Sequence, residues 1–423
     1  MKEIVKNKLN RILDHVGTSI QWVIFALLTG LLVGSISTLF HYGISLATEI
    51  RTENPRIIFL LPIGGLIIVK LYRLVKDQKE LSTNSVLSAI HSNEELPLKV
   101  APLIFVSTII THLFGGSAGR EGAALQFGGS IGNSVGRLFH LSDSDKHILI
   151  MCGMSAAFSA LFGTPMGAAI FSMEVVSVGI MQYSALVPCV VASLSAYYVA
   201  QAFGVSQELF LIDIIPKFTL LSAGKTIVLA VLCALVSILF CITLHQIERL
   251  YKKVFPNPYL RVFAGGCFII LLTLLVGAQT YNGSGMGVIK DCVEGKVIPE
   301  EFLLKIIFTA LTLGAGYKGG EIVPSLFIGA SFGCLFGNLI GFSPTLCAAV
   351  GMTSLFCGVT NCPITSLLIS FELFGYDGMP YFLLSIAFSY MLSGYYGLYS
   401  SQKIMYSKYH TKYINLTRKD KEF

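Results

Sequence analysis

The chain has 423 residues, of which 54% are hydrophobic and only 13% are charged. Soluble proteins carry about a quarter charged residues, so this composition excludes an ordinary soluble protein and indicates a polytopic membrane protein. The formal net charge of +6 is no sign of nucleic-acid binding, because many of the basic residues cluster at the two ends of the chain.

Long apolar segments recur along the chain, and several reach the roughly 20 residues that a helix needs to cross a bilayer. They lie at residues 19–48, 57–72, 99–118, 183–204, 219–246, 261–277 and 378–399. The first is too long for the apolar core of a signal peptide, so we expect a true span. Other apolar segments are interrupted by Gly, Pro or polar residues and predict helices broken inside the membrane. We therefore predict an all-α, multi-pass protein of the cell membrane.

Positive charge flanks the first and last spans. The flanking basic residues are Lys2, Lys6, Lys8, Arg11, Lys403, Lys408, Lys412, Arg418, Lys419 and Lys421. Since basic flanks stay on the cytoplasmic side, both termini are predicted to be cytoplasmic. A second basic cluster consists of Lys70, Arg73, Lys76 and Lys79. If the first span exits and the second returns, this cluster also lies inside, which places Ser82 near the cytoplasmic face.

An internal repeat divides the chain. The segment from Gly153 to Glu174 corresponds to that from Gly351 to Glu372 at a constant offset of 198, with six of 22 positions identical. We predict an N-terminal segment (1–18), a first membrane repeat (19–203), a linker (204–218), a second repeat (219–400) and a short cytoplasmic tail (401–423) without a further domain. The pattern alone leaves open whether the repeats are inverted or parallel. Glu174 and Glu372 take equal repeat positions, which favours a shared structural role near a helix end.

Two glutamates have matching surroundings in the two halves. Each follows a glycine-rich stretch and precedes an apolar segment, in Gly119-Arg120-Glu121-Gly122 and in Gly319-Gly320-Glu321-Ile322-Val323-Pro324. A carboxylate inside a membrane is costly and is a functional candidate by default. Duplicated surroundings indicate a transporter whose site lies at the junction of its repeats.

A glutamate that opens a buried helix suits anion transport. Backbone N–H groups at a helix start attract anions, and glycines let a ligand approach the backbone closely. An ionised carboxylate can occupy such a site, and protonation releases it, which links anion occupancy to proton occupancy. The structural alternatives are that Glu121 pairs with Arg120 or caps its own helix, and that Glu321 is a cap beside Lys318.

These motifs resemble the CLC family of chloride channels and transporters. The residues from Gly119 to Gly129 resemble its GREGP signature, those from Gly319 to Ala330 its G-x-F-x-P segment, and Leu398-Tyr399-Ser400 the segment with its pore tyrosine. The resemblance implies inverted repeats of tilted helices and a homodimer with one anion pathway per subunit. It implies that Glu121 is the gating glutamate, that Tyr399 is the inner pore hydroxyl, and that Ile322 and Val323 are backbone donors.

The chain also departs from the family pattern. Ser82-Thr83-Asn84-Ser85-Val86 replaces the GSGIP segment, so either Ser82 or Thr83 supplies the hydroxyl, and Ala123 replaces a proline. Glu321 is acidic as in the fluoride-exporting branch. Val175 stands where many exchangers have an internal proton-transfer glutamate. Yet that branch often has a methionine near Ser82, so chloride and fluoride both remain candidates.

The sequence therefore predicts halide transport coupled to protons, with a passive chloride channel as the alternative. The predicted gating and proton-coupling residues are Glu121 and Glu321, and the predicted anion-binding residues are Ser82, Thr83, Gly119, Arg120, Gly122, Ile322, Val323 and Tyr399. We predict no cofactor, because the cysteines lie singly and no metal-ligand spacing occurs.

Two other function classes fit less well. A secondary cation carrier would need clustered acids, whereas each acid here lies near a base, Arg120 or Lys318. The G-x-S-x-G pattern around Ser117 occurs in hydrolases on a strand-to-helix turn, and no such sheet is predicted. His112 lies in an apolar run and is predicted to be a hydrogen-bonded packing residue.

Overall fold

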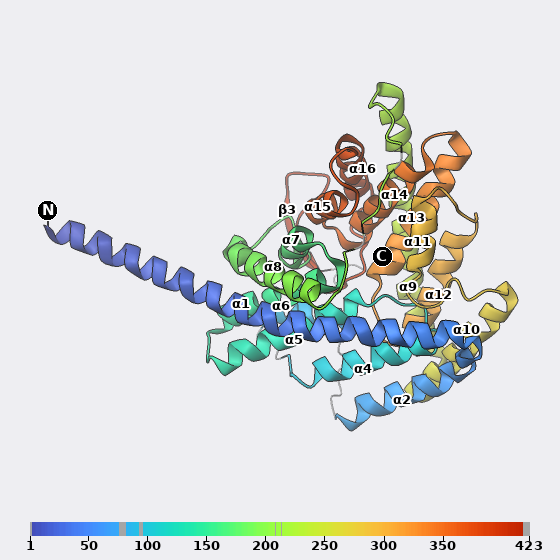
Figure 1. Ribbon diagram of the computed structural model, residues 1–423, viewed down its shortest axis with the longest axis horizontal. Helices are drawn as coiled ribbons and strands as arrows, with labels where there is room; N and C mark the ends of the chain where they lie inside the picture. Colours follow the sequence, from blue (N-terminus) through green and yellow to red (C-terminus); the bar gives the residue numbers. More distant parts are fainter. Residues whose placement is uncertain (1, 76–81, 93–95, 208, 213, 418–423) are drawn as a thin grey trace.

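The computed structural model describes residues 2–75, 82–92, 96–207, 209–212 and 214–417, with side chains from residue 15 onward (Figure 1). Some of the predicted basic flanks therefore lie outside the described residues or side chains, namely Lys2, Lys6, Lys8, Arg11, Lys76, Lys79, Arg418, Lys419 and Lys421.

Helices make up nearly the whole structure. The first half contains α1 (Lys2–Glu53), a 3-10 turn (Pro55–Leu60), α2 (Leu61–Leu74), α3 (Thr83–His91), α4 (Val100–Leu113), α5 (Glu121–Leu138), α6 (Asp143–Phe162), α7 (Pro165–Glu174), a second 3-10 turn (Tyr183–Ala185) and α8 (Leu186–Ala202). The second half contains α9 (Leu220–Val254), α10 (Pro258–Val276), α11 (Met286–Val293), α12 (Glu301–Ala315), α13 (Ile322–Ile340), α14 (Pro344–Thr360), α15 (Pro363–Phe374) and α16 (Met379–Leu392). The predicted segment 1–18 continues without a break into α1.

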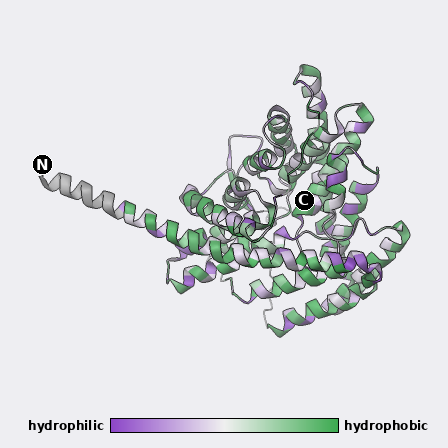
Figure 2. Cartoon of the chain, in the orientation of Figure 1, coloured by the Kyte–Doolittle hydropathy of each residue, from purple (hydrophilic) through white to green (hydrophobic). Residues whose placement is uncertain are grey.

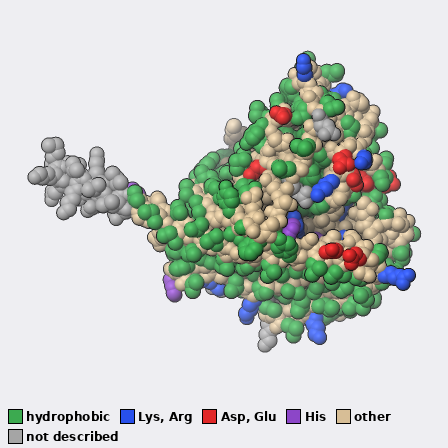
Figure 3. All heavy atoms as spheres, viewed as in Figure 1, with side chains coloured by type: hydrophobic (Ala, Val, Ile, Leu, Met, Phe, Trp, Pro, Cys, Tyr) green, Lys and Arg blue, Asp and Glu red, His purple; other side chains and the backbone are tan. Residues whose placement is uncertain are grey.

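Six helical stretches of the described residues are long and apolar enough to cross a membrane. They are His15–Glu53, Pro55–Leu74, Tyr183–Ala202, Leu220–Val254, Pro258–Val276 and Ile322–Ile340. Large apolar side chains of α1, α2 and α10 are exposed, among them Leu28, Ile63 and Leu271, and Figure 2 colours much of these three helices as hydrophobic. Charged side chains are sparse on the face shown in Figure 3. The protein is a multi-pass membrane protein, as predicted.

Several helices begin or end in the interior, where backbone irregularity is tolerated only inside protein or beside a wet cavity. Helix α4 ends at Leu113, and Gly115 turns the chain with φ of +85° before α5 begins. Proline opens both α7 and α15, at Pro165 and Pro363, where its missing N–H costs nothing. The broken helices predicted from the sequence are confirmed.

The two repeats meet as inverted copies. At the glycines before the two glutamates, Gly119 N–H donates to Gly320 O at 2.7 Å and Gly320 N–H donates to Gly119 O at 2.8 Å. These paired bonds form an isolated antiparallel bridge, which relates the two motifs by a local two-fold exchange. The inverted arrangement that the family resemblance implied is therefore the observed one.

Glu174 and Glu372 form a second pair of reciprocal contacts between the two repeats. Glu174, at the end of α7, accepts hydrogen bonds from the N–H groups of Ile364 and Thr365 at the start of α15. Glu372, in the last turn of α15, accepts from Met166 and Gly167 at the start of α7. Each carboxylate thus pairs the free N–H groups of the other repeat's helix, and the predicted structural role is confirmed.

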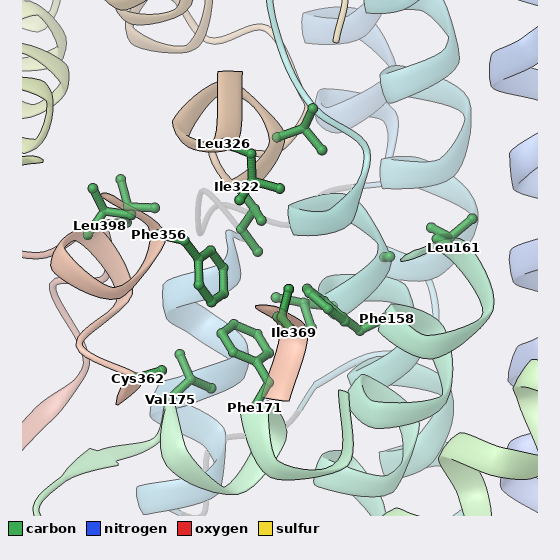
Figure 4. Close-up of a cluster of buried hydrophobic side chains, with 14 of the residues drawn as sticks. Phe158, Leu161, Phe171, Val175, Ile322, Leu326, Phe356, Cys362, Ile369 and Leu398 are labelled. Carbon is green, nitrogen blue, oxygen red and sulfur yellow. The ribbon is translucent and has the colours of Figure 1, made fainter. Parts of the chain in front are cut away.

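Aromatic and aliphatic side chains fill the space between the repeats (Figure 4). Phe171 of α7 lies 5.0 Å from Phe158 of α6 and 6.1 Å from Phe356 of α14, measured between ring centroids. Ile322, the first residue of α13, borders this cluster. The apolar packing excludes water behind the start of α13.

A short three-stranded sheet was not predicted. Its strands are β1 (Ser177–Val178), β2 (Lys403–Tyr406) and β3 (Tyr413–Thr417), in the order β1-β2-β3. β2 pairs in parallel with β1, directly after α7, and antiparallel with β3. The segment predicted as a short tail (401–423) is therefore paired with the first repeat through β2.

Candidate functional site

Glu121 is buried at the junction of the two repeats. Its side chain is 1% exposed and begins α5. Its Oε2 accepts a hydrogen bond from the backbone N–H of Arg120 at 3.1 Å, and its Oε1 lies 3.4 Å from the Arg120 Nε. The structural pairing with Arg120 is thus present. The carboxylate also occupies the helix start, where backbone N–H groups favour a negative charge.

Glycines let the carboxylates approach the backbone. A Cβ at position 119 would lie 3.0 Å from Glu121 Oε2, and a Cβ at position 122 would lie 3.5 Å from Glu321 Oε2 and 2.7 Å from Gly320 Cα. Both glutamates therefore border the short stretch from Gly119 to Gly122, where α5 begins. Side chains at positions 119 and 122 would displace the groups that meet there.

Glu321 has a different environment from its repeat counterpart. It is the N-cap residue of α13, but its side chain makes no capping hydrogen bond. Its Oε2 is buried without a hydrogen-bond partner among the described residues. The nearby Lys318 Nζ lies over the Tyr72 ring, 4.6 Å from its centroid. The sequence alternative of a structural cap beside Lys318 therefore has no capping bond to support it.

Arg120 reaches away from the bridge. Besides its contact with Glu121, its guanidinium lies 2.8 Å from His41 Nδ1 through Nη1, and Nη2 donates to Leu161 O at 3.1 Å. Arg120 therefore ties the Glu121 loop to α1 and α6. Its backbone N–H, rather than its guanidinium alone, contributes to the cradle that holds the carboxylate.

Tyr399 also faces this junction. Its side chain is 3% exposed, and its hydroxyl has no hydrogen-bond partner among the described residues. Both glutamate carboxylates lie within electrostatic range of this hydroxyl. A buried unpaired hydroxyl is costly, so the arrangement leaves a donor directed at a position that a ligand can fill.

The two predicted hydroxyl side chains, Ser82 and Thr83, differ in their burial and in their hydrogen bonds. Thr83 is buried, donates to Gly122 O at 3.3 Å and accepts from Gln126 Nε2 at 3.3 Å. Ser82 is half-buried and forms a capping box with Ser85 at the start of α3. Thr83 therefore supports the α5 start, while both residues line the cavity described next.

A cavity of about 1410 Å³ leads to the junction. Predicted site residues line it, namely Ser82, Thr83, Glu321 and Tyr399. Gln126, Glu248 and Arg261 line it as well and were not predicted as site residues. Gln126 was visible in the sequence as part of the first motif. Glu248 and Arg261 carried no signal, because they follow or open long apolar segments like ordinary flanking charges.

Ile322 and Val323 open α13 and are buried. As the first residues of a helix, their N–H groups have no acceptor within it. Together with Gly119, Arg120 and Gly122 they form two facing helix starts. The set is rich in donors, which suits an anion better than a cation.

The hydrolase pattern does not form a nucleophile site. Ser117 Oγ lies 3.1 Å from Thr309 Oγ1, and its N–H donates to Thr312 Oγ1 at 3.0 Å. His112 is buried and bonds the carbonyl of Thr108 through Nδ1 at 3.0 Å. Its predicted packing role is confirmed, and Ser117 connects the two repeats.

Comparison with known proteins gives consistent matches. A family model described as a voltage-gated chloride channel matches residues 64–394. A chloride/fluoride channel protein of Pseudomonas syringae pv. tomato is 33% identical over 92% of this chain and 88% of that protein. An H⁺/Cl⁻ exchange transporter of Vibrio vulnificus is 24% identical over 88% of this chain and 86% of that protein.

Solved structures give the same result. The crystal structure of a CLC-type fluoride/proton antiporter matches with a TM-score of 0.88 and 31% identity, covering 91% of this chain and 98% of that one. A slow cyanobacterial Cl⁻/H⁺ antiporter matches with a TM-score of 0.74 and 18% identity, over 88% and 94% of the two chains. The second likeness concerns the fold alone.

Proposed function

Because the chain belongs to the CLC family of voltage-gated chloride channels and related transporters, we propose that it exchanges a halide for protons across the cell membrane, and that fluoride is the halide. The observation that carries this proposal is the meeting of Glu121, Glu321 and Tyr399 at one buried junction that opens into a cavity. Two of these three groups hold polar atoms without a partner among the described residues.

The first step of the exchange is release of Glu121. While ionised, its carboxylate occupies the N–H cradle at the start of α5 and blocks a mobile anion. Protonation removes the charge that binds it to the backbone N–H and to Arg120. The neutral side chain then leaves, and a halide takes its place, so each halide bound corresponds to a proton taken up.

Glu321 supplies the second requirement. An ionised carboxylate beside the anion position repels a halide, whereas a protonated one donates a hydrogen bond to it. Its unpartnered Oε2 supports this role. Halide entry therefore requires protons on both glutamates, and this requirement links halide movement to proton movement, which passive conduction does not need.

Fluoride fits this donor set better than chloride. It is the smaller and more strongly hydrated ion, so a site must replace its water with good donors, at a cost of several kcal/mol for each bond not replaced. Tyr399 and a protonated Glu321 offer two hydroxyl donors besides the helix starts. The similar proteins named for fluoride, at 33% and 31% identity, support the assignment.

The topology belongs to the same proposal. We place both termini and the cavity on the cytoplasmic side, because Arg73 at the end of α2 lines the cavity and α1 and α2 each account for one crossing. Basic flanks favour the cytoplasm. We also propose that the protein is a homodimer with one pathway per subunit, which cross-linking of the purified protein in detergent would test.

Flux measurements on purified protein in liposomes test the function. Liposomes loaded with fluoride or chloride are monitored with halide and pH electrodes together. We expect fluoride efflux accompanied by proton uptake, and little chloride movement. Chloride efflux as fast as fluoride efflux would refute the assignment of the halide.

Variants test the residue roles. Glu121→Gln removes the titrating gate and is expected to abolish proton movement. Glu321→Ala tests whether Glu321 acts on protons alone or also on halide selection. Loss of proton movement with an unchanged halide preference would assign it a proton role only. Glu294→Gln is the control, because Glu294 is exposed and paired with Lys296. Unchanged coupling in Glu121→Gln would remove Glu121 from the mechanism.

A further inference from the structure

The cavity that leads to the junction has more cationic than anionic side chains. Four cationic side chains line it, from three helices and a loop, namely Arg73 of α2, Lys252 of α9, Arg261 of α10 and Lys318 before α13. His245, Tyr72 and Tyr317 line it too. Among its described lining residues the carboxylates are Glu248 and Glu321.

This charge distribution attracts halide into the cavity and repels hydronium from it. A cleft lined by one sign of charge raises the local concentration of the opposite ion by about 10- to 1000-fold, and a cleft with a net excess of cations such as this one acts toward the lower end of that range. The same potential depletes hydronium by a similar factor. A cavity that collects halide from the cytoplasm is therefore poor at delivering protons to Glu321 as free hydronium.

Glu248 lies where it can relieve this conflict. It shares one face of α9 with Leu244 and Lys252, four residues away on either side, and all three line the cavity. Helix α9 passes close to α12 at Gly314, where a Cβ would lie 3.2 Å from the Glu248 backbone nitrogen. The chain then runs on from Gly314 to Glu321, so Glu248 stands beside the segment that carries the second glutamate.

The carboxylate of Glu248 is accessible to water and is paired with a lysine. Its side chain is 46% exposed, and Oε1 lies 2.7 Å from Lys252 Nζ. Its charge acts on the Glu321 carboxylate across the cavity. Glu321, by contrast, holds a buried oxygen without a partner among the described residues. The two acids thus differ in access to water while sharing one cavity.

We propose that Glu248 is the proton-loading residue of the cytoplasmic side. Its carboxylate takes a proton from hydronium at the cavity mouth and leaves water. The protonated, neutral side chain then passes the proton to the Glu321 carboxylate, directly or through one water molecule, and returns to the ionised form beside Lys252. Carboxylate chains serve as proton relays in other membrane transporters. This role rests on the proposed proton-coupled exchange.

The test compares Glu248→Gln with the unchanged protein in liposomes at equal pH on both sides. Glutamine cannot carry the proton, so the coupled fluoride and proton fluxes should both fall near neutral pH. We expect a fall of at least about tenfold, because that is the lower end of the range by which a cationic cleft depletes hydronium. Acidification should restore the flux of Glu248→Gln, because hydronium becomes abundant, whereas Glu121→Gln should stay uncoupled. Glu248→Asp should keep most of the flux, and Glu294→Gln should match the unchanged protein.

A second background separates proton delivery from effects on the anion path. In Glu321→Gln, whose side chain is permanently neutral and takes no proton from Glu248, adding Glu248→Gln should leave the fluoride flux unchanged. A fall in that flux would place Glu248 in the anion path and overturn the proposal. Coupled flux in Glu248→Gln equal to that of the unchanged protein at every pH would also overturn it. If the unchanged protein moves fluoride without protons, this result refutes the proposed exchange itself rather than the role of Glu248 within it.

Discussion

Removing the cap on α15 should destabilise the protein more than removing its repeat counterpart. Glu174 accepts three hydrogen bonds, from Ile364 N–H at 3.0 Å, Thr365 N–H at 2.8 Å and the Thr365 hydroxyl at 2.6 Å. Its side chain is 7% exposed, so water has little access to replace it. At about 1.5 kcal/mol for each bond to a charged acceptor, Glu174→Ala is expected to cost about 4–5 kcal/mol.

The counterpart gives the matched comparison. Glu372 accepts two bonds, from Met166 N–H and Gly167 N–H, both at 2.8 Å. It is half-buried and Met166 is exposed, so water can replace part of what is lost. We therefore expect about 2–3 kcal/mol for Glu372→Ala. Because Glu174 and Glu372 occupy equal repeat positions, the difference between the two losses of stability reflects their hydrogen bonds rather than their place in the helix.

Thermal inactivation in detergent measures the ranking. The fraction of purified protein that stays monodisperse after heating is followed by size-exclusion chromatography, because unfolding of membrane proteins in detergent is irreversible and operational stability is then a rate. The expected order of midpoints is unchanged protein, then Glu372→Ala, then Glu174→Ala. Thr365→Val removes one of the three bonds, the one from the hydroxyl, and its midpoint should lie between those of the unchanged protein and Glu372→Ala. A Glu174→Ala midpoint equal to or above that of Glu372→Ala would refute the reasoning.

Three further predictions concern the site and the tail. Gly122→Ala places a Cβ 2.7 Å from Gly320 Cα and should cost about 1–3 kcal/mol and much of the flux, while Gly224→Ala, with no atom within 4 Å, should change neither thermal stability nor flux. Tyr399→Ala should reduce the preference for fluoride in anion-competition flux assays, and an unaltered anion ranking would count against its pore role. Lys408→Met removes the hydrogen bonds that Nζ donates to Asn361 Oδ1, Tyr390 O and Ser393 Oγ, so limited proteolysis should cleave the tail faster; equal rates would mean that Lys408 does not hold the tail.

The sequence was most informative where a costly residue recurs in matching surroundings. Glu121 and Glu321 lie 200 positions apart, yet the glycines before them form one antiparallel bridge. A membrane tolerates few carboxylates, so their repetition carried a strong signal. The repeat at Glu174 and Glu372 was equally visible, but only the structure shows that each carboxylate bonds the other repeat's helix start.

The unpredicted features depend on contacts that no local pattern encodes. Lys403–Tyr406 pairs with Ser177 and Val178, more than 200 positions earlier, as well as with β3. Gln402 shows the same dependence, because its Nε2 donates to Val175 O in the first repeat and Thr360 O in the second. In the sequence these residues are ordinary polar positions after the last span.

The two glutamates differ because they take positions one residue apart relative to their helices: Glu121 is the first residue of α5, whereas Glu321 is the N-cap residue of α13, the position that Arg120 has before α5. In the first motif the backbone N–H and the guanidinium of Arg120 both contact Glu121. In the second the Gly320 N–H donates to Gly119 O, and Glu321 Oε2 is buried without a hydrogen-bond partner among the described residues. An inverted repeat alone would give two equivalent half-sites with no preferred order of protonation. The shift by one position leaves one carboxylate paired and the other with an unpartnered oxygen beside the cavity, and in the proposed exchange this asymmetry sets the order in which the two are protonated.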